Sequence, residues 1–338
     1  MSRQVSGALA VSALAALHLA ALGADFLAPY GPTEQNRSLP YAPPTRLHMV
    51  DAEGRFHGWP VVYPMVRSRA GGTYEEDRRK SYPVLFLVPD GPGAPAGRVH
   101  LFGVEEPARI FLLGTDGFGR DQFSRLLHGA QISLFAGLLA TALSLGVGWL
   151  LGMLAGYYGR WLDAVLMRSA ELFLALPWLY LLFAVRAMLP LHVSPGQAFL
   201  LMVLVIGLVD WARPARLVRG LVLSARERNY VLAARGFGAS DLYLIRRHIA
   251  PQTFGLLLTQ AALLAPQYIL AEVTLSFLGL GVSEPVPSWG NMLAELQRYH
   301  VLASYWWMWI PGLALTTVFL AYYALSEALH SRTGQASA

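Results

Sequence analysis

The sequence has no cysteine and only one lysine among its 338 residues. Without cysteine the chain can form no disulfide, offers no thiol nucleophile and cannot hold a metal ion through thiolates. The one lysine, Lys80, lies in DRRKSY, where no glycine-rich loop precedes it. A phosphate-binding Walker A loop needs a lysine directly after its glycines. The chain therefore carries no P-loop ATPase of its own.

Charged residues are also scarce: Asp, Glu, Lys and Arg make up 14% of the chain, whereas soluble domains average about 25%. Hydrophobic residues make up 55%, and the mean hydropathy is +0.42. Several uncharged runs reach about 20 residues, which is enough to cross a hydrocarbon core of about 30 Å. These values predict an all-α, polytopic membrane protein.

Six apolar runs are the candidate transmembrane helices. They cover residues 5–24, 132–157, 172–189, 197–209, 254–280 and 304–325. The first run also resembles a cleavable signal peptide, because the small residues ALGA precede Asp25. Its length favours a retained helix.

The arginines predict the orientation of these helices. If Arg3 is cytoplasmic, the arginines of residues 210–251 and Arg332 fall on the same side, as the positive-inside rule requires. Residues 26–112 then lie outside with several basic residues, but loops longer than about 60 residues escape the rule. The net charge of +5 therefore indicates membrane orientation, and we expect no nucleic acid as a partner.

Residues 26–112 are rich in proline, glycine and aromatic residues. Short apolar runs such as YPVLFLVPD and RVHLFGV, bounded by turn residues, predict a small β-rich extracytoplasmic insert between the first two helices. Within it, GGTYEEDRRKS predicts an exposed loop and DGPGAPAG predicts a turn. The histidines are scattered, so no metal site is expected.

Residues 210–251 contain eight arginines and three acidic residues. From Glu227 onward, apolar residues at three- and four-residue steps predict a short helix, a tight turn and a second helix capped by Ser240 or Asp241. Small residues would let a partner approach the backbone; they are Ala233, Ala234, Gly236 and Gly238. This pattern indicates a cytoplasmic docking element. The alternative is an amphipathic helix held on lipid headgroups by arginine.

Two other places carry unusual charges. GTDGFGRD predicts a turn followed by a capped helix, with a local charge network of Asp116, Arg120 and Asp121. Glu272 is an acid inside the fifth span, six residues after Pro266, whose ring allows a kink. A buried carboxylate in a membrane indicates a pathway, a specific partner or proton coupling.

The segment RERNYVLAARGFGASDLYLIRRHIAP resembles the EAA loop of binding-protein-dependent ABC importer permeases. The segments LGTDGFGRDQFSRLLHGAQISL, GYYGRWLD, LAEVTLSFLGLG and PSWGNML fit the same pattern in the same order. Together they resemble the second of the two permease subunits of dipeptide, oligopeptide and nickel importers, over residues 113–330.

The resemblance implies six transmembrane helices in a bacterial inner membrane, with the N-terminus in the cytoplasm. Together with the apolar runs, it divides the chain into a first transmembrane helix in residues 1–25, the insert in 26–112, a permease core in 113–330 with a coupling loop at 224–251, and a cytoplasmic tail in 331–338. The insert is longer than the family leads us to expect. The resemblance also implies four protein partners: a second permease subunit, two cytoplasmic ATPase subunits, and a solute-binding protein outside. ATP would be bound by the partners, and this chain would bind no cofactor and catalyse no covalent reaction.

The resemblance also assigns roles to particular residues. The coupling loop to the ATPase would contain Glu227, Tyr230, Ala233, Ala234, Arg235, Gly236, Gly238 and Asp241. Glu272, Pro266 and Ser276 would be pathway or structural residues, and the resemblance favours the structural role for Glu272. The chain departs from the family pattern at Leu232, where a glutamate is usual, and at Gln131, where an arginine is usual.

The cargo expected from the resemblance is a di- or oligopeptide, and the insert is expected to contact the binding protein or to cover the outer gate. Two other functions stay open at this point. An ion-driven secondary transporter would need more intramembrane charge than Glu272 supplies. A membrane-anchored scaffold or enzyme would act through the outer segment, but the sequence contains neither GxSxG nor HExxH.

Overall fold

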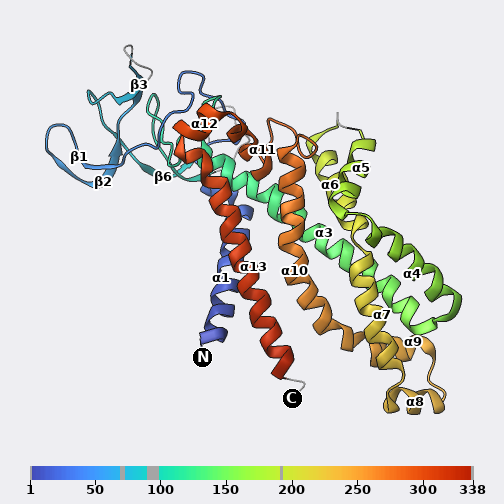
Figure 1. Cartoon of the computed structure of the whole chain (residues 1–338). Coiled ribbons are helices and arrows are strands. Elements are labelled where there is room, and N and C mark those ends of the chain that lie inside the picture. Colours follow the sequence, from blue (N-terminus) through green and yellow to red (C-terminus); the bar gives the residue numbers. More distant parts are fainter. Residues whose placement is uncertain (1, 69–72, 90–98, 191–192, 336–338) are drawn as a thin grey trace. The chain divides into compact units, whose positions relative to one another are not determined.

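The computed structural model describes residues 2–68, 73–89, 99–190 and 193–335, and Figure 1 shows its elements in chain order. The chain divides into two compact units. The insert-bearing unit contains residues 15–133 and 276–316, and the helical unit contains residues 1–14, 134–275 and 317–338. The boundaries fall inside four helices, which are α1 (Ser2–Leu22), α3 (Gln122–Tyr158), α10 (Ala250–Phe277) and α13 (Ile310–Gln335).

The insert-bearing unit contains short strands that pair antiparallel in three small sheets, in the orders β1-β2-β5, β3-β4 and β6-β7. The strands are β1 (His48–Val50), β2 (Phe56–Val62), β3 (Met65–Arg67), β4 (Tyr74–Glu76), β5 (Tyr82–Pro83), β6 (Leu85–Pro89) and β7 (Val99–Gly103). Beside them lies a small buried cluster of Val62, Tyr82, Val84, Ala108 and Ile110.

One predicted loop of this segment is wrong in part. Residues 74–76 were expected in an exposed loop, but they form β4, which pairs with β3. The Tyr74 hydroxyl donates a hydrogen bond to the carbonyl oxygen of Pro40 at 2.5 Å, which fixes the strand against a distant segment. The predicted turn DGPGAPAG lies outside the described residues.

Short helices complete the insert-bearing unit. They are α2 (Ala24–Leu27), α11 (Trp289–Ala294), α12 (Tyr299–Ser304) and the 3-10 turns η2 (Glu295–Gln297) and η3 (Trp306–Trp309). Helix α11 begins with a capping box between Ser288 and Asn291. The buried Trp289 then donates its indole hydrogen to the carbonyl oxygen of Leu126 in α3 at 3.1 Å. These contacts hold the segment after α10 against the start of α3.

Three helical segments are long and apolar enough to cross a membrane: Gln122–Tyr158, Asp241–Phe277 and Trp306–Leu329. Two bent pairs bring the number to five if each pair is one span. These pairs are α4 (Arg160–Ala175) with α5 (Trp178–Met188), and α6 (Pro195–Val209) with α7 (Ala212–Arg226). The described apolar part of α1, Gly7–Leu22, is shorter, so the structure does not confirm the six helices predicted from the sequence.

The predicted third span, residues 172–189, is wrong as a single helix. Helix α4 ends at Ala175, and α5 starts at Trp178 after a bend of 93°. Pro177 explains the break, because its ring disfavours the helical conformation of the preceding residue. Leu176 is accordingly extended, with φ −89° and ψ 140°.

The chain end and the fifth span also differ from the predicted boundaries. The predicted tail begins at residue 331, but α13 continues to Gln335, so the described part of that tail is helical. The helix that contains the fifth predicted span starts at Asp241 rather than near residue 254, because α9 (Asp241–Leu244), a π-helical turn η1 (Ile245–Ile249) and α10 form one continuous helix.

Glycines in α3 allow α7 to pack closely in the helical unit. Gly148, Gly152 and Gly156 are four residues apart and therefore lie on one face of the helix. A Cβ atom at Gly148 would lie 2.6 Å from Pro214, and one at Gly156 would lie 2.8 Å from Val222. Small residues allow such close helix contacts in membranes. This packing fixes α7, which leads directly into the predicted docking element.

Candidate functional site

The predicted charge network of GTDGFGRD is larger in the structure than the sequence indicated. Arg120 donates from Nε to Asp116 Oδ2 at 2.6 Å and from Nη1 to Glu284 Oε2 at 2.5 Å. Arg125 donates from Nη2 to the other oxygen of Glu284 at 2.8 Å. Arg120, Arg125 and Asp116 are buried. Sequence analysis missed Arg125 and Glu284, since no local pattern pairs residues about 160 positions apart.

Asp121, the third predicted member, has a different role from Asp116 and Arg120. Its Oδ2 accepts hydrogen bonds from the backbone nitrogen of Ser124 at 2.8 Å and from the Ser124 hydroxyl at 2.6 Å. It therefore caps the start of α3. Burial raises the pKa of Asp121 to about 7, and these hydrogen bonds oppose the shift.

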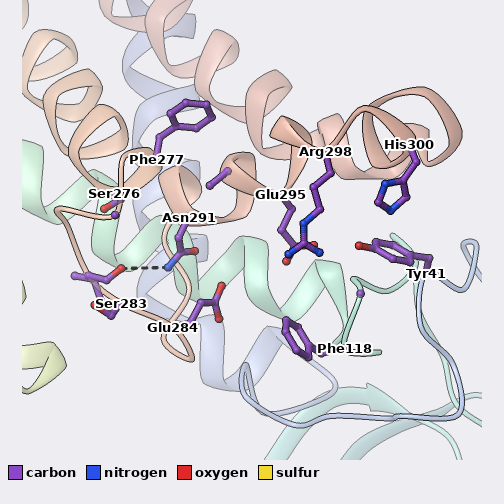
Figure 2. Close-up of a pocket in the computed structure, with 14 residues that line it drawn as sticks. Tyr41, Phe118, Ser276, Phe277, Ser283, Glu284, Asn291, Glu295, Arg298 and His300 are labelled. Atoms are coloured by element: carbon purple, nitrogen blue, oxygen red, sulfur yellow. Dashed lines mark hydrogen bonds between the residues drawn. The ribbon is translucent and has the colours of Figure 1, made fainter. Parts of the chain in front are cut away.

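Glu295 is a further acid in this region that the sequence analysis did not single out. Its Oε1 lies 3.6 Å from Arg120 Nη2. Burial, and after it the nearby Asp116 carboxylate, raise the pKa of Glu295 to about 7, although Arg125 and Arg120 lower it. Glu295 lines a cavity of about 650 Å³ in the insert-bearing unit, shown in Figure 2. Other residues that line it are Tyr41, Phe118, Glu284, Asn291, Arg298 and His300.

The three predicted pathway or structural residues all lie in α10. Glu272 is fully buried in the helical unit. Pro266 lies inside α10, and the helix continues through it as one span. Ser276 is buried in the other unit, where Gly281 packs directly against its hydroxyl.

A buried polar cluster in the helical unit was not predicted. The hydroxyls of Ser144 and Tyr268 lie 2.9 Å apart, and the Tyr268 hydroxyl donates to Asp210 Oδ2 at 3.1 Å. Arg213 Nε lies 3.5 Å from the other oxygen of Asp210. Asp210 occupies the break between α6 and α7, so the cluster ties that bend to α3 and α10.

The predicted helix–turn–helix at residues 227–249 is confirmed, and we call this segment the docking element. Helix α8 (Asn229–Gly236) ends at a turn in which Gly238 has a φ of +84°. A side chain is strained in that left-handed conformation, whereas glycine adopts it freely. Of the two predicted caps, Ser240 is the one that acts, since its hydroxyl accepts from the backbone nitrogen of Tyr243 at 3.4 Å.

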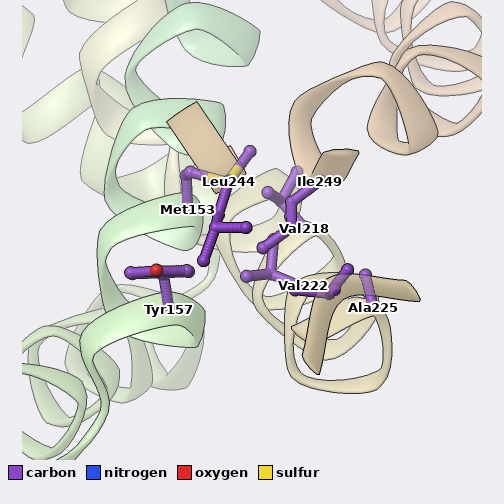
Figure 3. Close-up of a cluster of buried hydrophobic side chains, with 8 residues drawn as sticks. Met153, Tyr157, Val218, Val222, Ala225, Leu244 and Ile249 are labelled. Carbon is purple, nitrogen blue, oxygen red and sulfur yellow. The ribbon is translucent and has the colours of Figure 1, made fainter. Parts of the chain in front are cut away.

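The docking element stands on a buried apolar cluster, shown in Figure 3. Val231 from α8, Leu244 from α9 and Ile249 from η1 are fully buried. They belong to one cluster with residues of α3 and α7, which are Met153, Tyr157, Val218, Val222 and Ala225. The docking element is therefore packed directly against both helices.

Polar contacts reinforce this attachment. The Tyr157 hydroxyl donates to Asp241 Oδ1 at 2.5 Å and accepts from Arg235 Nη2 at 3.2 Å. Arg219 in α7 makes a two-fold ion pair with Asp163 in α4, at 2.5 and 2.6 Å. Asp163 closes the motif GYYGRWLD, so the structure gives that motif a role in holding α4 to α7.

The opposite face of the docking element is exposed and largely apolar. Phe237 at the turn has 93% of its surface exposed. Other exposed apolar side chains are Tyr230, Leu232, Leu242 and Tyr243, and the small residues Ala233, Gly236 and Gly238 are exposed beside them. Exposed arginines from the same segment are Arg228, Arg235, Arg246 and Arg247. Some of the apolar residues that predicted this helix pattern are therefore buried, and others are exposed to solvent.

The two departures from the expected family pattern have local contacts of their own. Leu232, which replaces a glutamate, is one of the exposed apolar residues. Glu227 is exposed and pairs with Arg226 at 3.0 Å. Gln131, which replaces an arginine, donates from Nε2 to the carbonyl oxygen of Ala21 at 2.8 Å and so ties α3 to α1.

Comparison with known proteins gives consistent matches. Residues 148–335 match the family model described as binding-protein-dependent transport system inner membrane component. A putative peptide permease protein of Brucella suis biovar 1 (strain 1330) is 39% identical over 217 residues, which is 64% of this chain and 70% of that protein. The dipeptide transport system permease protein DppC of Bacillus subtilis (strain 168) is 35% identical over 224 residues, 66% of this chain and 68% of that protein.

Two further matches are also to transport proteins. A putative peptide transport system permease protein of Brucella suis biovar 1 is 40% identical over 226 residues, covering 67% of this chain and 73% of that protein. Among solved structures, an inward-facing conformation of the MetNI methionine ABC transporter overlaps 61% of this chain and 95% of that chain, at 15% identity. Its TM-score of 0.46 is too low to support an argument about this chain.

Proposed function

The chain belongs to the family of binding-protein-dependent transport system inner membrane components, and we propose that it imports di- or oligopeptides as one of two permease subunits of an ATP-driven ABC importer. The names of its relatives support a peptide cargo, since several are peptide or dipeptide permeases. The proposed partners are a second permease subunit, two cytoplasmic ATPase subunits and an outer solute-binding protein. ATP is bound by the ATPase subunits, and this chain carries out no covalent step.

The exposed face of the docking element is the observation that carries this proposal. Phe237 exposes nearly all of its surface, and four exposed arginines lie in the same segment. Covering apolar surface stabilises a complex by about 25 cal/mol for each Å². A groove on the ATPase with apolar walls and an acidic rim would complement both features. Ser240, Tyr243 and Arg247 line a hollow of about 440 Å³. An acidic side chain from the rim of the ATPase groove could bind in this hollow.

The attachment of the docking element supplies the mechanical coupling. Val231, Leu244 and Ile249 fix it to α3 and α7. When the ATPase subunits bind ATP and close, they bind one conformation of the permease more tightly than the other, and this difference shifts the equilibrium. The docking element then moves with the ATPase, and α3 and α7 move with the docking element.

The proposed membrane arrangement has six spans. Three are the long helices, two are the bent pairs α4 with α5 and α6 with α7, and the sixth is α1. The N-terminus and the docking element lie in the cytoplasm, and the segment 26–112 forms an extracytoplasmic β-rich insert that contacts the solute-binding protein. The bacterial inner membrane supplies the lipid that covers the exposed apolar residues of these helices.

Co-purification with the candidate ATPase subunits tests the proposal. Phe237→Glu places a charge at the tip of the docking element without changing its turn, and we expect it to abolish co-purification. Phe56→Glu is the matched control, because Phe56 is also exposed but lies in β2. If Phe237→Glu retains the ATPase subunits, the docking proposal is wrong. ATP-independent uptake of peptide by this chain would instead favour an ion-driven transporter.

A further inference from the structure

The carboxylate of Glu295 is not satisfied by the network beside it. Both oxygens of Glu284 are already paired, one with Arg120 and one with Arg125. Arg120 Nη2 is 3.6 Å from Glu295, which is too long for a hydrogen bond, and this buried nitrogen has no hydrogen-bond acceptor in the part of the chain that the structure describes. Among the described residues, none donates a hydrogen bond to the side chain of Glu295.

The ion pairs around Glu295 involve more carboxylates than guanidinium groups. Three carboxylates, those of Asp116, Glu284 and Glu295, are matched by the two guanidinium groups of Arg120 and Arg125. Two further basic side chains, Arg298 and His300, line the same cavity but are exposed. No ion pair joins either of them to the glutamates within the described ranges. Glu295 therefore keeps only its 3.6 Å contact with Arg120 as an ion pair among the described residues, and a positively charged ligand can reach its carboxylate from the cavity.

The cavity has suitable size and walls for such a ligand. Its volume of about 650 Å³ lies within the roughly 300–1,000 Å³ that small-molecule sites occupy. Figure 2 shows Glu295 near the aromatic side chains of Tyr41 and Phe118. Tyr41 is held by stacking on Tyr305, with ring centroids 4.3 Å apart. The Arg120 guanidinium already covers the Phe118 ring, 4.7 Å from its centroid. Tyr41 is therefore the aromatic wall left for an alkylammonium group, which an electronegative ring face attracts.

We infer that this cavity binds the ammonium group of a peptide, either its free α-amino end or a lysine side chain, with Glu295 as the ionic partner. The inference rests on the proposed peptide cargo and assigns part of its recognition to this chain. Arg120, held by Asp116 and Glu284, fixes the acidic wall. A peptide bound here lies in the cavity of the insert-bearing unit with its ammonium group at Glu295.

Binding to the complete transporter in lipid nanodiscs, with the solute-binding protein left out, tests the inference. Ala-Ala-Ala is expected to bind at pH 8, and N-acetyl-Ala-Ala-Ala to bind at least tenfold more weakly. N-acetyl-Ala-Lys-Ala separates the two sources of ammonium, because its binding assigns the site to the lysine side chain. Equal binding of all three peptides, with or without an ammonium group, would overturn the inference.

Variants of the chain give an independent readout. Glu295→Gln is expected to weaken binding of Ala-Ala-Ala at least tenfold, and Glu295→Asp to restore part of it. Glu53→Gln is the matched control, because Glu53 is exposed in the insert and pairs only with the equally exposed Arg55 in the described part of the chain. If Glu295→Gln binds like the wild-type protein while Glu53→Gln is also unchanged, the inference is wrong.

The pH dependence separates Glu295 from the other titratable groups of the site. Because the pKa of Glu295 is raised to about 7, its charged fraction falls about tenfold between pH 8 and pH 6. The α-amino group of the peptide, with a pKa of about 8, gains about twofold in charged fraction over the same range. Affinity is therefore expected to fall about fivefold. The fall should persist in His300→Gln and disappear in Glu295→Gln. A fall that disappears in His300→Gln instead would contradict the inference.

Measurement of peptide uptake distinguishes an error in the ammonium site from an error in the proposed importer function. Wild-type transporter that takes up labelled Ala-Ala-Ala with ATP, yet binds it equally well after Glu295→Gln, refutes the ammonium site alone. Wild-type transporter that takes up no peptide at all refutes the peptide importer.

Discussion

The hydroxyl of Tyr157 donates a hydrogen bond to Asp241 Oδ1 at 2.5 Å. This bond joins the end of α3 to the first turn of α9, and so it links a membrane helix to the docking element. Arg235 in α8 donates to the same hydroxyl at 3.2 Å. One tyrosine thus holds both helices of the docking element.

Removal of this hydroxyl should loosen the coupling between ATP hydrolysis and transport. We expect Tyr157→Phe to bind the ATPase subunits normally, because the exposed face is unchanged, but to hydrolyse more ATP for each peptide imported. A hydrogen bond to a charged group contributes about 1.5–3 kcal/mol when buried, and Asp241 is exposed, so the loss of stability should be about 1 kcal/mol or less. The ratio of ATP hydrolysed to solute imported in proteoliposomes measures the effect.

Tyr158→Phe is the control for this prediction. Tyr158 is the next residue, is 48% exposed and makes no side-chain hydrogen bond in the described part of the structure. The two variants should therefore differ. An unchanged ratio in both variants would show that the Tyr157 bond does not contribute to coupling.

The glycine face of α3 gives a prediction about stability. A Cβ atom at Gly152 would contact the carbonyl oxygen of Ala215 and lie 2.9 Å from Val218, so Gly152→Ala must push α7 away. Overpacking of this kind costs about 1–3 kcal/mol, and thermal unfolding of the purified protein should show it. Gly146→Ala in the same helix meets nothing within 4 Å and should be neutral or stabilising. Equal melting temperatures of the two variants would contradict this account of the packing.

The ion-pair network at the start of α3 predicts that two arginine substitutions lower the unfolding free energy by very different amounts. Arg120→Ala leaves Asp116 buried without its main ionic partner, and such a loss costs about 3–5 kcal/mol. Arg168→Ala breaks the ion pair with Glu171, which joins exposed side chains at 3.3 Å. That variant should change the unfolding free energy by about 0.5 kcal/mol or less. Unfolding in denaturant compares the two variants, and similar losses would refute the buried role of Arg120.

Asp121 predicts how stability varies with pH. Its pKa is raised to about 7 in the folded protein from 3.8 in the unfolded chain, so the folded state binds more protons between these values. Stability should therefore fall as pH rises from about 4 to 7 and change little above that range. Asp121→Asn keeps an oxygen for the cap but cannot ionise, so it should reduce the difference between unfolding midpoints at pH 5 and pH 8. An unchanged difference would show that Asp121 does not titrate in this range.

Local patterns were sufficient to predict the docking element. Gly238 marks the turn because of its backbone freedom, and Ser240 marks the next helix because its hydroxyl can cap it; both signals act within a few residues. The same reasoning placed Asp116 and Arg120 together, since a turn brings them within hydrogen-bond distance.

Contacts between distant segments could not be predicted in this way. Glu284 reaches Arg120 and Arg125 only after α10 and the loop that follows it have returned to the start of α3. Asp210 and Tyr268 meet for a similar reason, although they are 58 residues apart. The break at Pro177 did have a local signal, but hydropathy alone favoured a single span across it.

The location of Phe237 tests the central claim most directly. Because the natural chain has no cysteine, Phe237→Cys introduces a single thiol to which a photoactivated cross-linker can be attached. In inverted membrane vesicles that contain the complete transporter, the account predicts a cross-link to an ATPase subunit that ATP binding alters. Labelling of this thiol only from the extracytoplasmic side, or cross-links to lipid alone, would contradict it.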